Sequence, residues 1–346
     1  MPLIETLFMA ILVLAVIGFI GPFFQPNQRS KSKSSSSSSS SPSSSSKELS
    51  RHSAIANNFR TLQEVETALR KAGLESSEMM IAIDLTRSNT WQGSKTFQGL
   101  NLHYLSDSPD FQNPYQQVIS VVSDVLMNKL DDDAEIPLYG FGDLHTGNHS
   151  VFMMNNGQPC RSKAEPLDAY ATTVQNVKLS GPTSFAPIIY EAIDHCKATG
   201  KYMILFIIAD GMMDDVQQTI DAIVAASQYP LSIVTIGVGD GPWESMEEFD
   251  DDIPQRAFDN FQFLSHTRLM QLYPDAHQRN MHFALEALME LPEQYQLIKK
   301  LGLLGSKPDD RVQFKHRLVG KHIFRQPQRA YPQVEGQEPP SYFSSR

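Results

Sequence analysis

Four short apolar runs constrain the fold more than any other feature of the chain. Each is apolar at nearly every position, which is typical of strands that are covered on both faces. The runs occupy residues 79–83, 136–141, 202–209 and 231–239. Stretches with helical periodicity lie between them, at residues 114–130, 184–198 and 214–227. Because strands that alternate with helices imply right-handed crossovers, we predict an α/β fold: a doubly wound, mainly parallel sheet flanked by helices.

Oxygen-bearing side chains stand where two of these runs end. Asp84, Thr86 and Ser88 follow the first run, Asp210 follows the third, and Thr183 lies in a loop before a predicted helix. Ligand sites of parallel sheets form beyond the carboxyl ends of strands, so we expect these side chains at one edge. All five are hard oxygen donors, a set that selects Mg²⁺ or Mn²⁺, and after them Ca²⁺, over zinc or copper.

Each of these residues also has an ordinary structural interpretation. Asp84 could form a turn, Ser88 could cap a helix, and Thr183 could cap the helix that follows Pro182. For any one residue alone the structural role would be preferred. The joint occurrence of D-x-T-x-S, a later G-x-T and a still later D-G favours the metal site.

The N-terminal region predicts a membrane anchor within residues 1–28. Residues 7–24 form an uninterrupted run of apolar, Gly and Pro residues. A cleaved signal peptide is the alternative, although no cationic segment precedes the run. Arg29 and Lys31 follow it, so the positive-inside rule predicts a single-pass protein whose folded domain lies in the cytoplasm.

Low-complexity segments flank the predicted domain at residues 58–304. Residues 29–57 form a Ser-rich flexible linker, and residues 305–346 form a Pro- and Arg-rich tail that we expect to be extended or disordered. Near its end, Pro339, Pro340 and Tyr342 match the P-P-x-Y ligand of WW domains, with chance occurrence as the alternative. The formal net charge is −10 without a basic stripe, so we expect no nucleic-acid partner.

Further stretches carry a resemblance to a known family. "IDLTRSN", "GPTS" and "ADG" look like the metal-ion-dependent adhesion site of a von Willebrand factor A domain, a Rossmann-like fold. "YGFGD", "FDDDIPQRAFDNFQF" and "FALEALMELPEQY" resemble the copine-type domain found in RING-type ubiquitin ligases. The resemblance covers about residues 60 to 304. It implies that Thr86, Ser88 and Thr183 offer hydroxyls to the metal, while Asp84 and Asp210 bind it directly or through water.

The resemblance also implies a function, which the departures from the family restrict. Copines carry C2 domains ahead of this domain, and the first 58 residues here are too few for one. The related ligases end in a RING finger, and no cysteine follows Cys196. We therefore expect no enzyme but a membrane-tethered, metal-dependent adaptor that binds a partner's acidic residue. The alternatives are a component of ubiquitination that acts with a separate ligase, such as a WW-domain ligase, and a membrane-trafficking adaptor.

Overall fold

The computed structural model describes residues 60–74, 77–108, 110–127, 135–251, 253 and 256–305. All of them belong to the second of two compact units, Leu49–Arg346. The predicted linker, the tail with its P-P-x-Y motif, and the apolar run at residues 7–24 lie outside the described residues.

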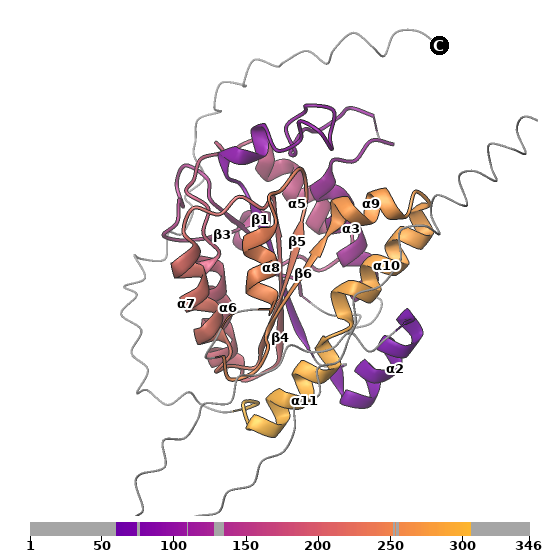
Figure 1. Ribbon diagram of the computed structural model, residues 1–346. Coiled ribbons are helices and arrows are strands. Elements are labelled where there is room, and N and C mark those ends of the chain that lie inside the picture. Colours follow the sequence, from indigo (N-terminus) through magenta and orange to yellow (C-terminus); the bar gives the residue numbers. More distant parts are fainter. Residues whose placement is uncertain are drawn as a thin grey trace, which may run out of the picture. The chain divides into compact units, whose positions relative to one another are not determined.

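The described residues form a six-stranded sheet in the order β3-β2-β1-β4-β5-β6 (Figure 1). Neighbouring strands are parallel except for β3, which is antiparallel to β2. The strands are β1 (Glu78–Asp84), β2 (Leu138–Phe141), β3 (Phe152–Met153), β4 (Met203–Ala209), β5 (Leu231–Gly237) and β6 (Phe261–Ser265). The four predicted strands correspond to β1, β2, β4 and β5, so the predicted fold class is confirmed.

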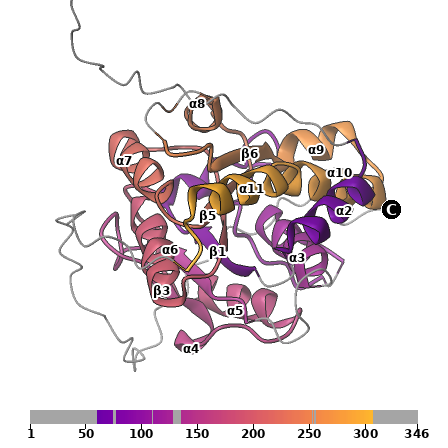
Figure 2. The ribbon, with the colours of Figure 1, turned by 90° about the horizontal axis from the view of Figure 1, so that it is seen from below.

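Helices cover both faces of the sheet, as Figure 2 shows from below. On one face lie α6 (Ala186–Thr199), α7 (Val216–Ala226) and α8 (Glu244–Asp251). The other helices are α2 (Leu62–Ala72), α3 (Pro114–Met127), α4 (Met154–Gly157), α5 (Glu165–Val174), α9 (His266–Leu272), α10 (Ala276–Leu288), α11 (Leu291–Leu301) and the 3-10 helix η2 (Arg87–Thr90).

The central strands contribute to a separate core on each face. Along β1, Ile81 and Ile83 pack with α2, α3 and α10, whereas Met80 and Ala82 pack with α6 and α7. Successive side chains of a strand point to opposite faces, so an apolar residue is needed at every position. This requirement explains the near-continuous apolar runs of the sequence.

The predicted localisation is contradicted by the described part of the chain. We predicted a single-pass, membrane-anchored protein, but no helix among the described residues is long and apolar enough to cross a membrane. A spanning helix needs about 20 consecutive, predominantly apolar residues. The longest described helices, α3 and α6, have 14 residues each and contain polar positions. The run at residues 7–24, on which the prediction relied, lies outside the described residues.

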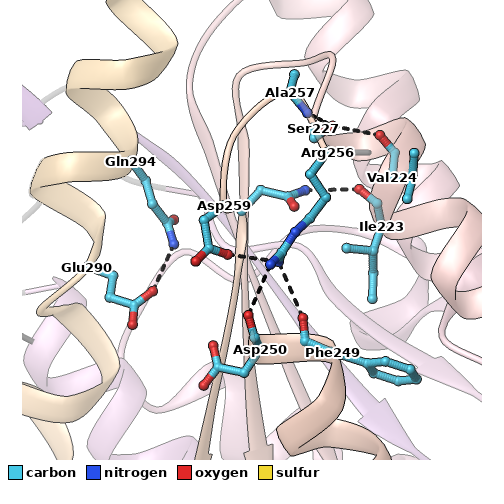
Figure 3. Close-up of polar contacts among 11 residues, drawn as sticks. Ile223, Val224, Ser227, Phe249, Asp250, Arg256, Ala257, Asp259, Glu290 and Gln294 are labelled. Atoms are coloured by element: carbon cyan, nitrogen blue, oxygen red, sulfur yellow. Dashed lines mark hydrogen bonds and ion pairs between the residues drawn. The ribbon is translucent and has the colours of Figure 1, made fainter. Parts of the chain in front are cut away.

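A buried ion pair lies before β6, at the amino edge of the sheet (Figure 3). Arg256 Nη1 lies 2.8 Å from Asp259 Oδ1, and the two side chains are 5% and 4% exposed. Arg256 also donates to the carbonyl oxygens of Phe249, at 3.3 Å, and Asp250, at 3.0 Å. Because all three interactions come from one guanidinium, Arg256 connects the end of α8 to the segment that enters β6.

Candidate metal centre

The two predicted carboxylate ligands end neighbouring strands. Asp84 is the last residue of β1, and Asp210 directly follows β4. β1 and β4 pair in parallel over six residues, with Ile83 opposite Ile208, so their carboxyl ends lie side by side. Both aspartates are fully buried. The segment that follows β1 lies over this upper end of the sheet in Figure 1.

Hydrogen bonds connect four of the five predicted ligands. The Thr86 amide donates to Asp84 Oδ1 at 2.8 Å, and the hydroxyls of Thr86 and Ser88 lie 2.9 Å apart. Ser88 is in turn hydrogen-bonded to the side chain of Asp210. Asp84, Thr86, Ser88 and Asp210 therefore form one cluster, in which no side chain is more than 7% exposed.

Thr183 reaches the same edge through the backbone of its loop. Ser180 forms a parallel bridge with Thr86, and its carbonyl accepts the Arg87 amide at 2.7 Å. The Thr183 amide donates to Asp214 Oδ2 at 2.8 Å. Thr183 is 2% exposed, and the hydrogen bonds described for it join it to Asp214 and Asp215 rather than to the four clustered residues.

The alternative structural roles account for only part of these side chains. Ser88 lies inside η2 rather than at its N-cap, and the N-cap of α6 is Phe185, so neither Ser88 nor Thr183 caps a helix. Asp84 does form a local turn, because its Oδ1 accepts the Thr86 amide, and Asp210 Oδ1 accepts the Met212 amide at 3.1 Å. In both aspartates these turns use Oδ1 only and give Oδ2 no role.

The second carboxylate oxygens of Asp84 and Asp210 are buried polar atoms that lack a partner. Oδ2 of Asp84 and Oδ2 of Asp210 are buried and have no hydrogen-bond partner. Burial, and then repulsion from Asp210, raises the pKa of Asp84 well above its usual range. Burial also raises the pKa of Asp210 to about 6, with Asp214 adding repulsion and the hydrogen bond from Ser88 opposing it. A cation between the carboxylates would offset this cost, so the residues present fit a divalent metal.

The donor set depends on hydroxyls as well as carboxylates. Among the residues that the structure describes, no group of three or more His, Cys, Asp and Glu side chains could hold a metal ion. Two carboxylates with the hydroxyls of Thr86, Ser88 and Thr183 are oxygen donors of the kind that Mg²⁺ and Mn²⁺ accept. The arrangement thus suits a hard cation and not a zinc site of imidazole and thiolate.

Two glycines make room at the cluster. A Cβ on Gly142, which follows β2 with φ of 80°, would clash with Cγ2 of Thr86. A Cβ on Gly211, with φ of 93°, would lie 2.5 Å from the carbonyl oxygen of Pro242. Both positions combine a left-handed backbone with close packing, which only glycine tolerates without strain.

A buried polar network beneath Asp84 was not predicted from the sequence. His103 Nε2 lies 2.9 Å from the Asp84 carbonyl oxygen, and Nδ1 lies 2.8 Å from the Tyr170 hydroxyl. Because a carbonyl can only accept, Nε2 carries the proton and the Tyr170 hydroxyl donates to Nδ1. Burial lowers the pKa of His103 to about 3, so the ring is neutral. Asn89, which receives a hydrogen bond from Tyr115, donates to the Thr86 carbonyl at 3.0 Å.

A third buried carboxylate at this edge was also missed. Asp143 follows β2 by two residues, and its Oδ1 accepts the Thr146 amide at 2.9 Å and the Thr146 hydroxyl. Its Oδ2 is buried without a hydrogen-bond partner. The signal was present, because "YGFGD" places an aspartate just beyond an apolar run, as in the cases of Asp84 and Asp210.

Comparison with known families identifies the domain. A family model described as Copine matches residues 101–307, which is more than half of the chain. The chain belongs to the copine family. The resemblance to a copine-type domain is thereby confirmed, whereas the metal-ion-dependent adhesion site stays a prediction.

The relatives include both ubiquitin ligases and copines. E3 ubiquitin-protein ligase RGLG5 of Arabidopsis thaliana is 48% identical over 75% of this chain and 63% of its own length. Copine family protein 2 of Caenorhabditis elegans is 44% identical over 71% of this chain and 3% of its own length. This chain spans between 54% and 63% of the length of the first three Arabidopsis ligases that it matches.

The likeness to solved structures is weaker. The SpRpn10 VWA domain is 14% identical, with a TM-score of 0.38 over 55% of this chain and 87% of that chain. The manganese-loaded TRAP protein of Plasmodium vivax is 12% identical, with a TM-score of 0.38 over 57% of this chain and 72% of that chain. These values carry no argument about the site.

Proposed function

We propose that this copine domain is a divalent-metal-dependent protein-binding module. Asp84, Thr86, Ser88, Thr183 and Asp210 would hold Mg²⁺ or Mn²⁺, and an Asp or Glu of a partner protein would complete the coordination. The observation that carries the proposal is the pair of buried aspartates, each with one carboxylate oxygen that lacks a partner. A divalent cation satisfies both oxygens at once.

The composition of the cluster favours recognition over catalysis. Mg²⁺ demands near-octahedral coordination by six ligands, so five side chains leave at least one position for an external oxygen. His103, the histidine in contact with Asp84, is unsuited to general base catalysis because both ring nitrogens are hydrogen-bonded and its pKa is low. An acidic side chain from a partner fits the open position.

Titration calorimetry with Mg²⁺ tests the proposal. We expect the full chain to bind Mg²⁺ and Asp210→Ala to lose more than about 100-fold in affinity, because even changes outside the ligand shell cost roughly 10–100-fold. Asp215→Ala is the matched control, since Asp215 ends the same loop as the N-cap residue of α7 and its side chain makes no capping hydrogen bond. Equal Mg²⁺ affinity in Asp210→Ala and in the unmodified chain would refute the metal centre.

A second candidate function is a role in ubiquitination. The 48% identity with E3 ubiquitin-protein ligase RGLG5 favours it, although the match covers 63% of that protein. We expect this chain to act with a separate ligase and therefore to be inactive alone in a purified ubiquitination assay. Ubiquitin transfer by the chain with only the activating and conjugating enzymes would contradict this expectation.

The P-P-x-Y motif offers a specific form of this role. Pro339, Pro340 and Tyr342 lie outside the described residues, so WW-domain binding stays a prediction. A peptide of residues 330–346 should bind a WW domain, and the Tyr342→Ala peptide should not, since the aromatic ring fills the groove. Failure of the unmodified peptide against a broad WW panel would remove this part of the proposal and leave the metal centre untouched.

A further inference from the structure

Exposed apolar side chains lie at the edge of the sheet that carries the proposed metal centre. Seven large apolar side chains are exposed among the described residues. Three of them lie in the loops that follow the neighbouring strands β1, β2 and β4: Trp91 is 50% exposed, Leu144 51% and Met212 37%. We call these three residues the apolar rim. Large apolar side chains that gather around a polar site typically mark a binding surface.

The positions of the rim residues are fixed by the same contacts that fix the ligands. The Trp91 amide donates to the Ser88 carbonyl at 3.0 Å, and the Met212 amide donates to Asp210 Oδ1 at 3.1 Å. Leu144 follows Asp143, and its amide donates to the Lys178 carbonyl at 2.9 Å, in the segment that leads to Thr183. Trp91 and Met212 are thus hydrogen-bonded to candidate ligands, and Leu144 is hydrogen-bonded to the segment that leads to Thr183.

The loops behind the rim are braced by the segment after β5. Asp240 accepts hydrogen bonds from the hydroxyls of Ser94 and Thr96 and from the amides of Lys95 and Thr96, at 2.6 to 2.9 Å. Gln92 donates to the carbonyl of Gly241, and the Asp240 amide donates to the carbonyl of Gln92 at 2.8 Å. The ring of Trp243 packs against Gly211, the residue that precedes Met212 in the chain. Braced loops lose little entropy when they bind, so the rim is preorganised.

Charges around the rim favour an acidic ligand. Arg87 is exposed between Thr86 and Ser88, and its amide is held by the Ser180 carbonyl. Lys178 is exposed beside the Leu144 segment. Arg87 and Lys178 would attract a carboxylate, whereas the exposed Asp214, two residues after Met212, would repel it, so the attraction depends on the proposed metal.

We propose that the apolar rim of Trp91, Leu144 and Met212 selects the partner, so that the ligand is a protein segment in which one Asp or Glu is flanked by bulky apolar side chains. This inference rests on the proposed function, because the metal receives the carboxylate. The metal supplies a contact that any acidic residue can make, whereas the rim distinguishes one acidic segment from another.

Synthetic peptides of nine residues provide the test. One set carries a central Leu-Asp-Leu, Phe-Asp-Leu or Leu-Asp-Trp, a second carries Ser-Asp-Ser, and a third carries Leu-Asn-Leu. Binding to the full chain is measured by fluorescence polarisation in Mg²⁺ and in EDTA. We expect Mg²⁺-dependent binding that is at least about 10-fold tighter for the apolar-flanked Asp peptides than for Ser-Asp-Ser, since burying one large apolar side chain accounts for a factor of this size.

Variants separate the rim from the metal. Trp91→Ser, Leu144→Ser and Met212→Ser should each weaken the apolar-flanked Asp peptides by about 10-fold and keep the Mg²⁺ affinity seen by calorimetry. Leu272→Ser removes a side chain that is 55% exposed on α9 and should change neither quantity. Equal Mg²⁺-dependent binding of Leu-Asp-Leu and Ser-Asp-Ser, or rim variants that bind like the unmodified chain, overturns this inference alone. Absence of Mg²⁺-dependent binding by every Asp peptide overturns the proposed function with it.

Discussion

Two groups of buried acidic side chains lie at opposite edges of the same parallel sheet. At the carboxyl edge, Asp84 and Asp210 end neighbouring strands, and among the described residues no ion pair joins either of them to a Lys or Arg. At the amino edge, Asp259 and Glu290 lie in a cluster that contains Arg256 (Figure 3). Both edges bury carboxylates, but in the described part of the chain only the amino edge places an arginine, Arg256, beside them.

The two edges differ in how the buried charge is balanced by the described residues. Arg256 neutralises Asp259, while burial and repulsion from Asp250 and Asp259 raise the pKa of Glu290 to about 9, so that Glu290 keeps its proton at neutral pH. One cation and one proton therefore balance the amino edge. Among the described residues of the carboxyl edge, no ion pair joins Asp84 or Asp210 to a Lys or Arg, and Oδ2 of Asp84, Asp143 and Asp210 has no hydrogen-bond partner. A buried charge needs compensation, which the proposed divalent cation would supply at this edge.

Removing Arg256 should have the largest effect, because it would turn the amino edge into an uncompensated site. Arg256→Ala removes the cation that lies against the buried carboxylate of Asp259, which typically costs about 3–5 kcal/mol in the free energy of unfolding. Urea denaturation measures this loss. Arg161→Ala breaks an ion pair whose side chains are 67% and 52% exposed, and it should cost less than about 1 kcal/mol. Equal losses in the two variants would show that burial does not distinguish these ion pairs.

Adding a metal should have the next largest effect, and only at the carboxyl edge. Mg²⁺ at about 100 times its dissociation constant should raise the free energy of unfolding by about 2.7 kcal/mol, because it binds the folded state. Asp84→Ala should abolish this increment. Arg256→Ala should keep it in full on a lower baseline, since distant sites contribute additively. An increment that disappears with Arg256 would mean that the two edges are coupled.

The sequence predicted the carboxyl edge better than the amino edge for a physical reason. Strand ends are readable from local apolar runs, and the parallel topology then brings Asp84 and Asp210 together without knowledge of any side-chain contact. The amino-edge cluster depends on the meeting of α8, the segment before β6 and the start of α11. Such tertiary contacts leave no local periodicity, so Arg256 and Glu290 were not recognised.

Strand lengths and burial explain the elements that were missed. β3 has two residues and β6 has five, of which Phe263 and Ser265 are only partly buried, so neither forms a continuous apolar run. His103 and Tyr170 were missed because their hydrogen bonds join residues 67 positions apart in the chain. Asp143, in contrast to His103 and Tyr170, follows an apolar run and could have been predicted from the sequence as a carboxylate at the carboxyl edge.

Neutralising Glu290 should have an effect that is smallest in acid and grows as pH rises. Below about pH 4.5 the carboxyl is protonated in both folded and unfolded chains, so Glu290→Gln should leave the free energy of unfolding nearly unchanged. Between about pH 4.5 and the folded-state pKa of about 9, only the unfolded chain loses the proton, so the stability of the unmodified protein falls as pH rises.

Gln mimics the protonated side chain and cannot ionise, so the variant should not lose stability in this way. We expect Glu290→Gln to be more stable than the unmodified protein by at least about 1 kcal/mol at pH 8, because each unit by which the folded-state pKa is raised contributes about 1.4 kcal/mol. Urea denaturation from pH 5 to pH 9 measures the difference, with Glu247→Gln on the exposed side of α8 as the control. A Glu290→Gln curve parallel to that of the unmodified protein would mean that Glu290 is ionised when folded. The amino edge would then hold an excess negative charge, and its contrast with the carboxyl edge would be one of degree.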